Sequence, residues 1–269
     1  MGNKIINSMQ FAIIKKDLMS IISNKQLFLS LFIVPVMFTV IMPVIFIITI
    51  YFTGQEDISD LQPLLDILPA SMQSEDIDII MKSMVLNYLM PTFFMLIPIL
   101  TASVMAASAF VGEKEKRTLE TLLYCPLTVR QIFQSKVWAS FFLSMAVSLA
   151  SFIVMIIVTE TGFWLVDGAM VMPDFNWLFM LLIVSPAVSL LAIILIVGGS
   201  AKAKTVEESQ QRSLFLILPW VLIMTVQFTG VVFLSSWYLL GVGVIFAALA
   251  FILMKKSMRK FTYEQLLKS

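Results

Sequence analysis

Histidine is absent from this 269-residue chain, cysteine occurs once, and charged residues make up only 13% of it. Without histidine the chain cannot build the His-Glu zinc sites, Ser-His dyads or histidine proton relays of many intramembrane enzymes. The dipeptide Gly-Lys never occurs, so the phosphate-binding loop G-x-x-x-x-G-K-[ST] is also missing. We therefore expect no catalytic residue, no metal site and no cofactor bound by this chain. Any ATP-driven work would depend on a partner.

Long apolar runs are what the chain has in abundance. Hydrophobic residues make up 59% of it, and its mean hydropathy of +0.97 is far above that of a soluble domain. Six runs are long enough to cross a hydrocarbon core of about 30 Å, and none contains Asp, Glu, Lys or Arg. We place these six predicted spans at residues 27–52, 88–111, 137–159, 177–201, 214–234 and 237–254. Their lack of charge argues against the ion-relay carboxylates of proton- or sodium-coupled carriers.

The basic residues predict the orientation. With six spans, the N-terminus, the loops 112–136 and 202–213 and the tail 255–269 share one side. That side holds 17 of the 18 Lys and Arg residues, and only Lys82 falls on the other. The positive-inside rule places the basic side in the cytoplasm. We predict an all-α integral membrane fold of six transmembrane helices with both termini inside, in the cell membrane.

Three segments lie outside the spans. Residues 1–26 form the first predicted unit, before a transmembrane domain at 27–254 and a basic tail at 255–269 that suits anionic headgroups. The outer loop 53–87 carries seven acidic residues against one lysine. It caps the outer mouth of the domain, and whether it faces a substrate or only solvent stays open.

An amphipathic helix is predicted within residues 1–26. Its apolar residues recur at helical spacing, and Lys16, Asp17 and Ser20 fall on the opposite arc. A helix of this kind suits the membrane interface. The polar stretch 23–26 favours a break before the first span, although an extension of that span is the alternative. The apolar residues are Phe11, Ile14, Leu18, Ile21 and Ile22.

Polar residues inside the spans are few. Ser140, Ser144, Ser148 and Ser151 form one stripe along the third span, and Gln227 lies near the middle of the fifth. Small residues at this spacing normally let helices approach closely and form hydrogen bonds. They are therefore candidates either for close packing or for lining a translocation path. We keep Ser140, Ser144, Ser148 and Gln227 as the candidate path residues.

The loop 112–136 reads GEKEKRTLETLLYCPLTVRQIFQSK and has internal order. A mixed charge run opens it, and Leu119, Leu122 and Leu123 then form an apolar ridge with Glu120 on the far side. Pro126 ends this turn, and a capping box of the T-x-x-Q type starts a new helix at residue 128. We predict a short surface helix held between the second and third spans. The alternative is an ordinary helical connection.

The same loop resembles the signature of ABC type-2 transporter permeases, E-x-E-x-G-T-L-E-x-L-L followed after two residues by P-[LIV]-[ST]. The leading acids correspond to Glu113 and Glu115, and the proline motif to residues 126–128. Arg117 stands where glycine is common, and Ser135 replaces the glycine before Lys136. The subfamily with an outer loop between spans one and two, which includes sodium-efflux-like, peptide-exporting and antibiotic-exporting permeases, fits best.

The resemblance implies the membrane subunit of a bacterial ATP-driven exporter in the inner or plasma membrane. A second permease subunit, identical or related, would complete the path, and two separate ATPase subunits would hold ATP and Mg. No nucleic acid is expected. A largely apolar path suits a hydrophobic or amphiphilic peptide, antibiotic, drug or lipid. The competing hypothesis is a non-transporting immunity or sensor subunit that binds a cytoplasmic partner through the same loop.

The resemblance also implies which residues contact the ATPase subunit. In that family, the N-terminal helix and the signature loop are the two elements that hold the ATPase. In the loop these residues are Glu113, Glu115, Arg117, Thr118, Leu119, Glu120, Leu122 and Leu123. The helix at 11–22 would help the docking, and Phe11, Ile14, Leu18 and Ile22 are its interfacial residues.

Overall fold

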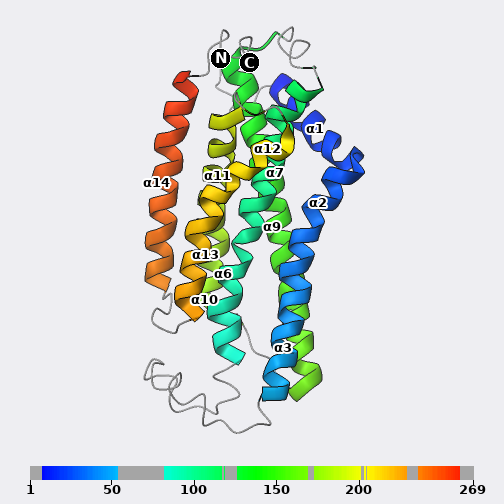
Figure 1. Ribbon diagram of the computed structural model, residues 1–269, viewed down its shortest axis with the longest axis vertical. Helices are drawn as coiled ribbons and strands as arrows, with labels where there is room; N and C mark the ends of the chain where they lie inside the picture. The colour runs from blue at the N-terminus through cyan, green and yellow to red at the C-terminus, as the bar shows by residue number, and fades with distance from the viewer. Residues whose placement is uncertain are drawn as a thin grey trace.

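The computed structural model describes residues 8–53, 82–116, 118, 126–168, 173–200, 203, 205–228 and 236–260. Within these ranges the chain is helical and contains no strand. Figure 1 shows an elongated bundle whose long helices run along one axis, with the short helix α1 set across one end. That end is called the α1 end below. The all-α prediction is confirmed for this part of the chain.

The described helices follow one another along the chain in this order. The first half comprises α1 (Ser8–Ser23), α2 (Lys25–Val36), η1 (Met37–Ile41), α3 (Met42–Thr53), η3 (Val85–Leu89), α6 (Met90–Phe94), α7 (Leu96–Glu115) and α9 (Val129–Asp167). The second half comprises α10 (Phe175–Phe179), η4 (Met180–Val184), α11 (Ser185–Ser200), α12 (Val206–Gln210), η5 (Gln211–Ser213), α13 (Leu214–Phe228) and α14 (Ser236–Lys260). The predicted break between the N-terminal helix and the first span is present, because Asn24 separates α1 from α2.

Four helical stretches are long and apolar enough to cross a membrane. They are Leu27–Phe52, Lys82–Glu115, Val129–Val166 and Phe175–Ser200, and they contain most of the first four predicted spans. The helices extend beyond the apolar runs, since a helix can continue through polar residues whose side chains find hydrogen-bond or ionic partners on neighbouring helices. The apolar part of α13, Phe215–Val226, is shorter, and the fifth predicted run continues into residues outside the described part. The count of six and the orientation therefore stay predictions.

Three π-helical turns interrupt these long helices, and each ends two residues before a proline. The turn η1 precedes Pro43, η3 precedes Pro91, and η4 precedes Pro186. Proline has no N–H to donate, and its ring clashes with the carbonyl four residues earlier. That carbonyl falls inside the π turn in every case, where the wider hydrogen-bond ring relieves the clash. The helices thus continue through their prolines.

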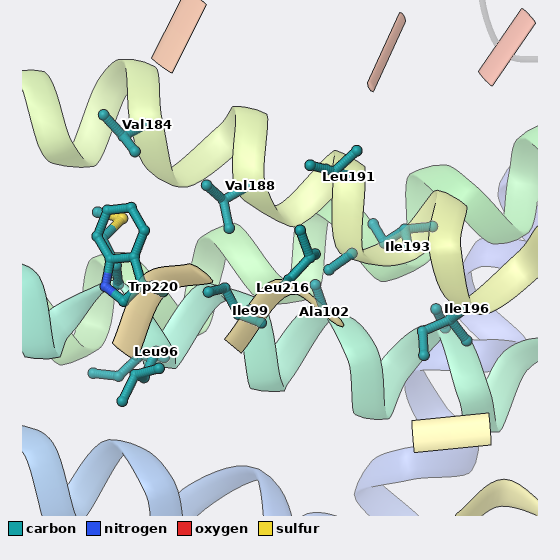
Figure 2. Packing of buried hydrophobic residues seen from close by; sticks show 14 of the residues in the cluster. Leu96, Ile99, Ala102, Val184, Val188, Leu191, Ile193, Ile196, Leu216 and Trp220 are labelled. Atoms are coloured by element: carbon teal, nitrogen blue, oxygen red, sulfur yellow. The ribbon is translucent and has the colours of Figure 1, made fainter. Parts of the chain in front are cut away.

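The core lies where α7 packs against α11, with α13 over the contact. Figure 2 shows the buried side chains gathering from these helices and from η4. Ala102 of α7 is fully buried, and small residues of this kind let two helix backbones approach closely. The Trp220 indole N–H donates to the Thr92 carbonyl at 2.7 Å and fixes α13 to α6. Other labelled members are Leu96, Ile99, Val184, Val188, Leu191, Ile193, Ile196 and Leu216.

The first and third long helices lie at the edge of the bundle. Figure 1 shows α2 and α3 along one side of it. Many of their apolar side chains are exposed, for example Phe52 on α3 and Ile153 on α9. Exposed apolar stripes along helices of this length suit lipid or a neighbouring transmembrane subunit.

Replacing Ala102 with leucine tests the close approach of α7 and α11. We expect the Ala102→Leu variant to lose about 1–3 kcal/mol of stability, because added methylenes in a packed core force side chains and backbone apart. The measurement is the thermal midpoint of the purified protein in detergent. Ala248 is exposed on α14, so Ala248→Leu is the matched control and should leave the midpoint unchanged. Equal midpoints for the two variants would contradict this packing.

Candidate functional site

The two ends of the loop 112–136 are described, and its middle is not. Helix α7 ends at Glu115, and α9 begins at Val129. The expected contact residues Arg117, Leu119, Glu120, Leu122 and Leu123 lie outside the described residues, so the predicted short helix stays a prediction. Thr118 is placed, and its backbone N–H donates to the Glu113 carbonyl at 2.8 Å. The chain therefore turns back on itself as it leaves α7.

The start of α9 is fixed by the predicted capping box. The Thr128 hydroxyl accepts the Gln131 backbone N–H at 3.3 Å, and the Gln131 side chain accepts the Thr128 N–H at 2.9 Å. Each side chain satisfies an N–H that the first helical turn would otherwise leave unpaired. This prediction is confirmed.

Helix α1 lies against this first turn of α9. The Gln10 side-chain amide donates to the Gln131 carbonyl at 3.5 Å. Ile13 packs on Ile132, with Leu127 beside them. The N-terminal helix and the second end of the loop 112–136 are thus in direct contact; the family resemblance implies that the two elements work together.

The faces of α1 differ from the predicted ones. Ile14 and Ile21 are buried in the protein, whereas Phe11 and Ile22 are 62% and 63% exposed. Leu18 is half-buried between them. Burial thus divides the predicted apolar arc, because its edge with Ile14 and Ile21 packs against the protein and its edge with Phe11 and Ile22 is turned outward. The outward face suits lipid headgroups and chains, and an interfacial position for it stays a prediction.

Asp17 was expected on the exposed arc of α1, and the structure buries it. Its carboxylate points toward Lys136, the last residue of the loop 112–136, at 3.6 Å. Amphipathic patterning identifies the polar side of a helix, and it cannot show that another helix brings a cation to that side. The buried ion pair is the physical reason for the departure.

Lys136 lies at the centre of a group of charges whose members are buried except for the half-exposed Lys16. Its ammonium is 3.1 Å from the Glu113 carboxylate and donates to the Ala109 carbonyl. The other oxygen of Glu113 accepts from the Lys16 ammonium. Lys136 also lies 5.7 Å from the centre of the Phe110 ring. We call Lys16, Asp17, Glu113 and Lys136 the Lys136 cluster; it joins α1, the end of α7 and the start of α9.

The charges of the Lys136 cluster balance one another. The side chains of Lys136, Asp17 and Glu113 are 4%, 6% and 9% exposed, so they have lost most of their contact with water. Two carboxylates face two ammonium groups, which offsets part of the large cost of burying ions. Burial raises the pKa of Asp17, and the nearby Lys136 ammonium opposes that rise. The Lys136 ammonium therefore stabilises the Asp17 carboxylate at a buried position that would otherwise be unfavourable for a charge.

A recess of about 170 Å³ opens beside the Lys136 cluster, between α1 and α7. Lys116 and Thr118, where the chain leaves α7, form part of its wall. The described loop end and α1 thus border one concave surface. Its other lining residues are Lys16, Asp17, Ser20, Ile21, Ser108, Ala109, Gly112 and Glu113.

Glu115 points to the opposite side of α7. Its carboxylate accepts the backbone N–H of Val206, the first residue of α12, at 3.3 Å. Val206 packs closely on Gly112 of α7. This contact between α7 and α12 is not predicted by the apolar pattern. The pattern from Thr205 to Glu208 indicates a helix start, and the Thr205 hydroxyl indeed accepts the Glu208 N–H at 3.2 Å.

The two leading acids of the loop therefore fix the end of α7 from two sides. Glu113 holds it to α1 and α9, and Glu115 holds it to α12. Both were expected to contact a partner directly. The structure places the Glu113 carboxylate away from the surface, while Glu115 and Thr118 are exposed. One signal in the sequence could have predicted the inward position of Glu113. Lys136 directly precedes the third predicted span, where a cation needs an acidic partner.

The serine stripe lies inside the bundle. Ser140, Ser144 and Ser148 are all fully buried. The Ser144 hydroxyl is 3.1 Å from the hydroxyls of Thr101 and Ser189 and donates to the Pro98 carbonyl at 3.2 Å. This is the geometry of close helix packing between α9, α7 and α11. A path-lining role for the stripe stays a prediction, as does that of Gln227, whose side chain lies outside the described part.

The capping box gives a local prediction. The Thr128→Ala variant should lose about 1 kcal/mol at the start of α9, and hydrogen exchange of its first turn should rise about fivefold. Thr161 lies inside α9, where its hydroxyl bonds only to the carbonyl of Ile157 and Val158 in the same helix. Thr161→Ala is the matched control and should not change exchange at the first turn. Unchanged exchange in both variants would show that the cap is dispensable.

One comparison with known proteins places this site in a family. A family model described as ABC-2 family transporter protein matches residues 11–240. The match covers the Lys136 cluster, both ends of the loop 112–136 and α12. No curated protein matches the chain. With a match over most of its length and helices long enough to span a membrane, the chain belongs to the ABC-2 family of transporter proteins and is the membrane component of an ABC transporter.

Proposed function

We propose that the chain is the permease subunit of an ATP-binding-cassette exporter in a bacterial cell membrane. With a second permease subunit, identical or related, it forms the translocation path. Two separate ATPase subunits on the cytoplasmic side bind ATP and Mg and supply the energy. Membership of the ABC-2 family supports association with an ABC ATPase, and the sequence has no phosphate-binding loop of its own.

The observation that carries the proposal is the assembly at the α1 end. Helix α1, both ends of the loop 112–136 and α12 are held together there by side-chain contacts. The loop enters and leaves through α7 and α9, two of the long apolar helices. A partner that moves the loop therefore acts on both helices at once, which is what a coupling element requires.

The contact with the ATPase is assigned to the middle of the loop. Leu119, Leu122 and Leu123 provide an apolar ridge that suits a groove on the ATPase subunit, with Glu120 at its edge. Arg117 and Thr118 lie next to this ridge in the sequence. Glu113 acts from inside, by holding the first end of the loop, instead of touching the ATPase.

The substrate is assigned to a hydrophobic or amphiphilic class. The predicted spans contain no charged residue, and the exposed faces of α2, α3 and α9 are apolar. A path between two such subunits offers little to replace the water around a small hydrated ion. A peptide, antibiotic, drug or lipid with a large apolar part is the better fit, and export is the direction we propose.

Docking is tested by copurification. The double variant Leu119→Asp/Leu122→Asp should lose its ATPase subunit in pull-downs and no longer stimulate ATP hydrolysis, because two charges remove the apolar ridge. The tail offers a matched control with another leucine pair on the same predicted side, Leu266→Asp/Leu267→Asp, which should retain the ATPase. An ATPase that stays bound and stimulated by the loop variant would refute docking through this ridge. Binding without any stimulation in the unaltered chain would favour the immunity or sensor hypothesis.

The path is tested at Gln227. The Gln227→Leu variant should reduce export, because it removes the amide predicted to line the path near the middle of the fifth predicted span. The measurement is the resistance of cells to a panel of hydrophobic peptides and amphiphilic drugs, with copurification of the ATPase as the assembly control. Full resistance in an assembled variant would remove Gln227 from the path.

A further inference from the structure

Lys136 is a buried lysine whose ammonium is shared by three helices. It belongs to α9, its carbonyl partner Ala109 and its acid Glu113 belong to α7, and its second acid Asp17 belongs to α1. Lysine is almost never fully buried unless it is paired. Lys136 lies near the start of α9, where its flexible side chain could extend to the surface, but the side chain stays buried.

Two apolar clusters join the three helices at this end. Ile13 of α1 packs on Ile132 of α9, and Ile21 of α1 packs with Val104 and Met105 of α7. The hydrophobic attraction in these clusters is non-directional. The directional contacts among the three helices at this end are the Gln10 hydrogen bond to Gln131, the Lys16–Glu113 pair and the ion pairs of Lys136.

We propose that Lys136 is a positioning residue for coupling: it locks α1, the end of α7 and the start of α9 into one body, so that movement of the loop 112–136 reaches both long helices. The inference rests on the proposed function and names the residue that transmits the movement. It separates two steps: the ATPase first contacts the loop, and the movement of the loop is then transmitted along the bundle.

The role of Lys136 can be tested with variants that keep the charges around it balanced, so that the chain still folds. Removal of the lysine alone leaves Asp17 buried beside Glu113 with one cation fewer. The double variant Asp17→Asn/Lys136→Met removes one charge of each sign and keeps the Lys16–Glu113 pair. Replacing a buried ion pair with neutral side chains of similar volume is often tolerated. The single variant Asp17→Asn releases only α1 and leaves Lys136 paired with Glu113.

Two spin labels distinguish contact of the ATPase with the loop from transmission of the movement along α9. Cys125, the one cysteine of the chain, lies in the loop 112–136 and accepts a nitroxide spin label there. Leu165 is 75% exposed near the far end of α9, and Leu165→Cys in a Cys125→Ser background carries the second label. Label mobility is measured in the complete complex with its ATPase in lipid nanodiscs. The two conditions are no nucleotide and ATP with Mg and vanadate.

In the otherwise unaltered complex both labels should change mobility with nucleotide. In Asp17→Asn/Lys136→Met, the response at position 125 should remain and the response at position 165 should be lost. Asp17→Asn alone should lose part of the response at 165, and Lys136→Arg should keep it, because the cation is restored. The matched control is Lys82→Met, which removes a lysine that is also buried at the other end of the α7 stretch and should leave both responses intact. A purely structural role would lower the thermal midpoint without separating the two responses.

The outcomes decide between the two proposals. A full response at 165 in the double variant overturns the role of Lys136 and leaves the proposed function standing. Loss of both responses would show that the Lys136 cluster forms the docking surface, which also overturns it. Should the double variant not assemble, an unchanged response at 165 in Asp17→Asn overturns the lock on α1. No response at 125 in the unaltered complex overturns the proposed function and this inference with it.

Discussion

Polar groups inside an apolar bundle must find their partners within it, and this constraint governs most of the structure. The Ser144 hydroxyl has three hydrogen-bond partners on two other helices, and Trp220 donates to a carbonyl of α6. Pro43, Pro91 and Pro186 each follow a wider turn of their own helix. Lys136 is the most demanding case, because an ammonium has to be neutralised as well as bonded. The hydrogen bonds of Ser144 and Trp220 and the ion pairs of Lys136 each tie two or more helices together, so these few polar residues select how the helices pack.

Family membership and geometry contribute different parts of the functional argument. The family match identifies the membrane component of an ABC transporter, and says nothing of which residues carry motion. The geometry shows that the first acid of the loop signature, Glu113, is an internal contact and that the second, Glu115, holds a neighbouring helix. A signature acid can thus be required for the arrangement of the loop without touching the partner.

The sequence predicts the helices well and their contacts poorly. Apolar runs suffice to find the four long helices, and Thr128 with Gln131 suffices to place the start of α9, because both depend on neighbours along the chain. The partner of Asp17 is 119 residues away, so helical periodicity alone places it in water. The contact between Glu115 and α12 is missed for the same reason, although Thr205 marks where that helix begins. Which residues a helix buries is decided by the other helices, and periodicity does not contain that information.

The π turns have a mechanical consequence. Figure 1 places α6 and α10, which adjoin η3 and η4, toward the end of the bundle opposite α1. A π turn departs from the hydrogen-bond pattern of the regular helix around it, and such turns are common sites of helix kinks. The two ends of the bundle therefore differ in construction, because ion pairs join three helices at one end and π turns interrupt two helices toward the other. If the proposed exporter tilts its helices from the α1 end, we expect the bending to fall at these turns.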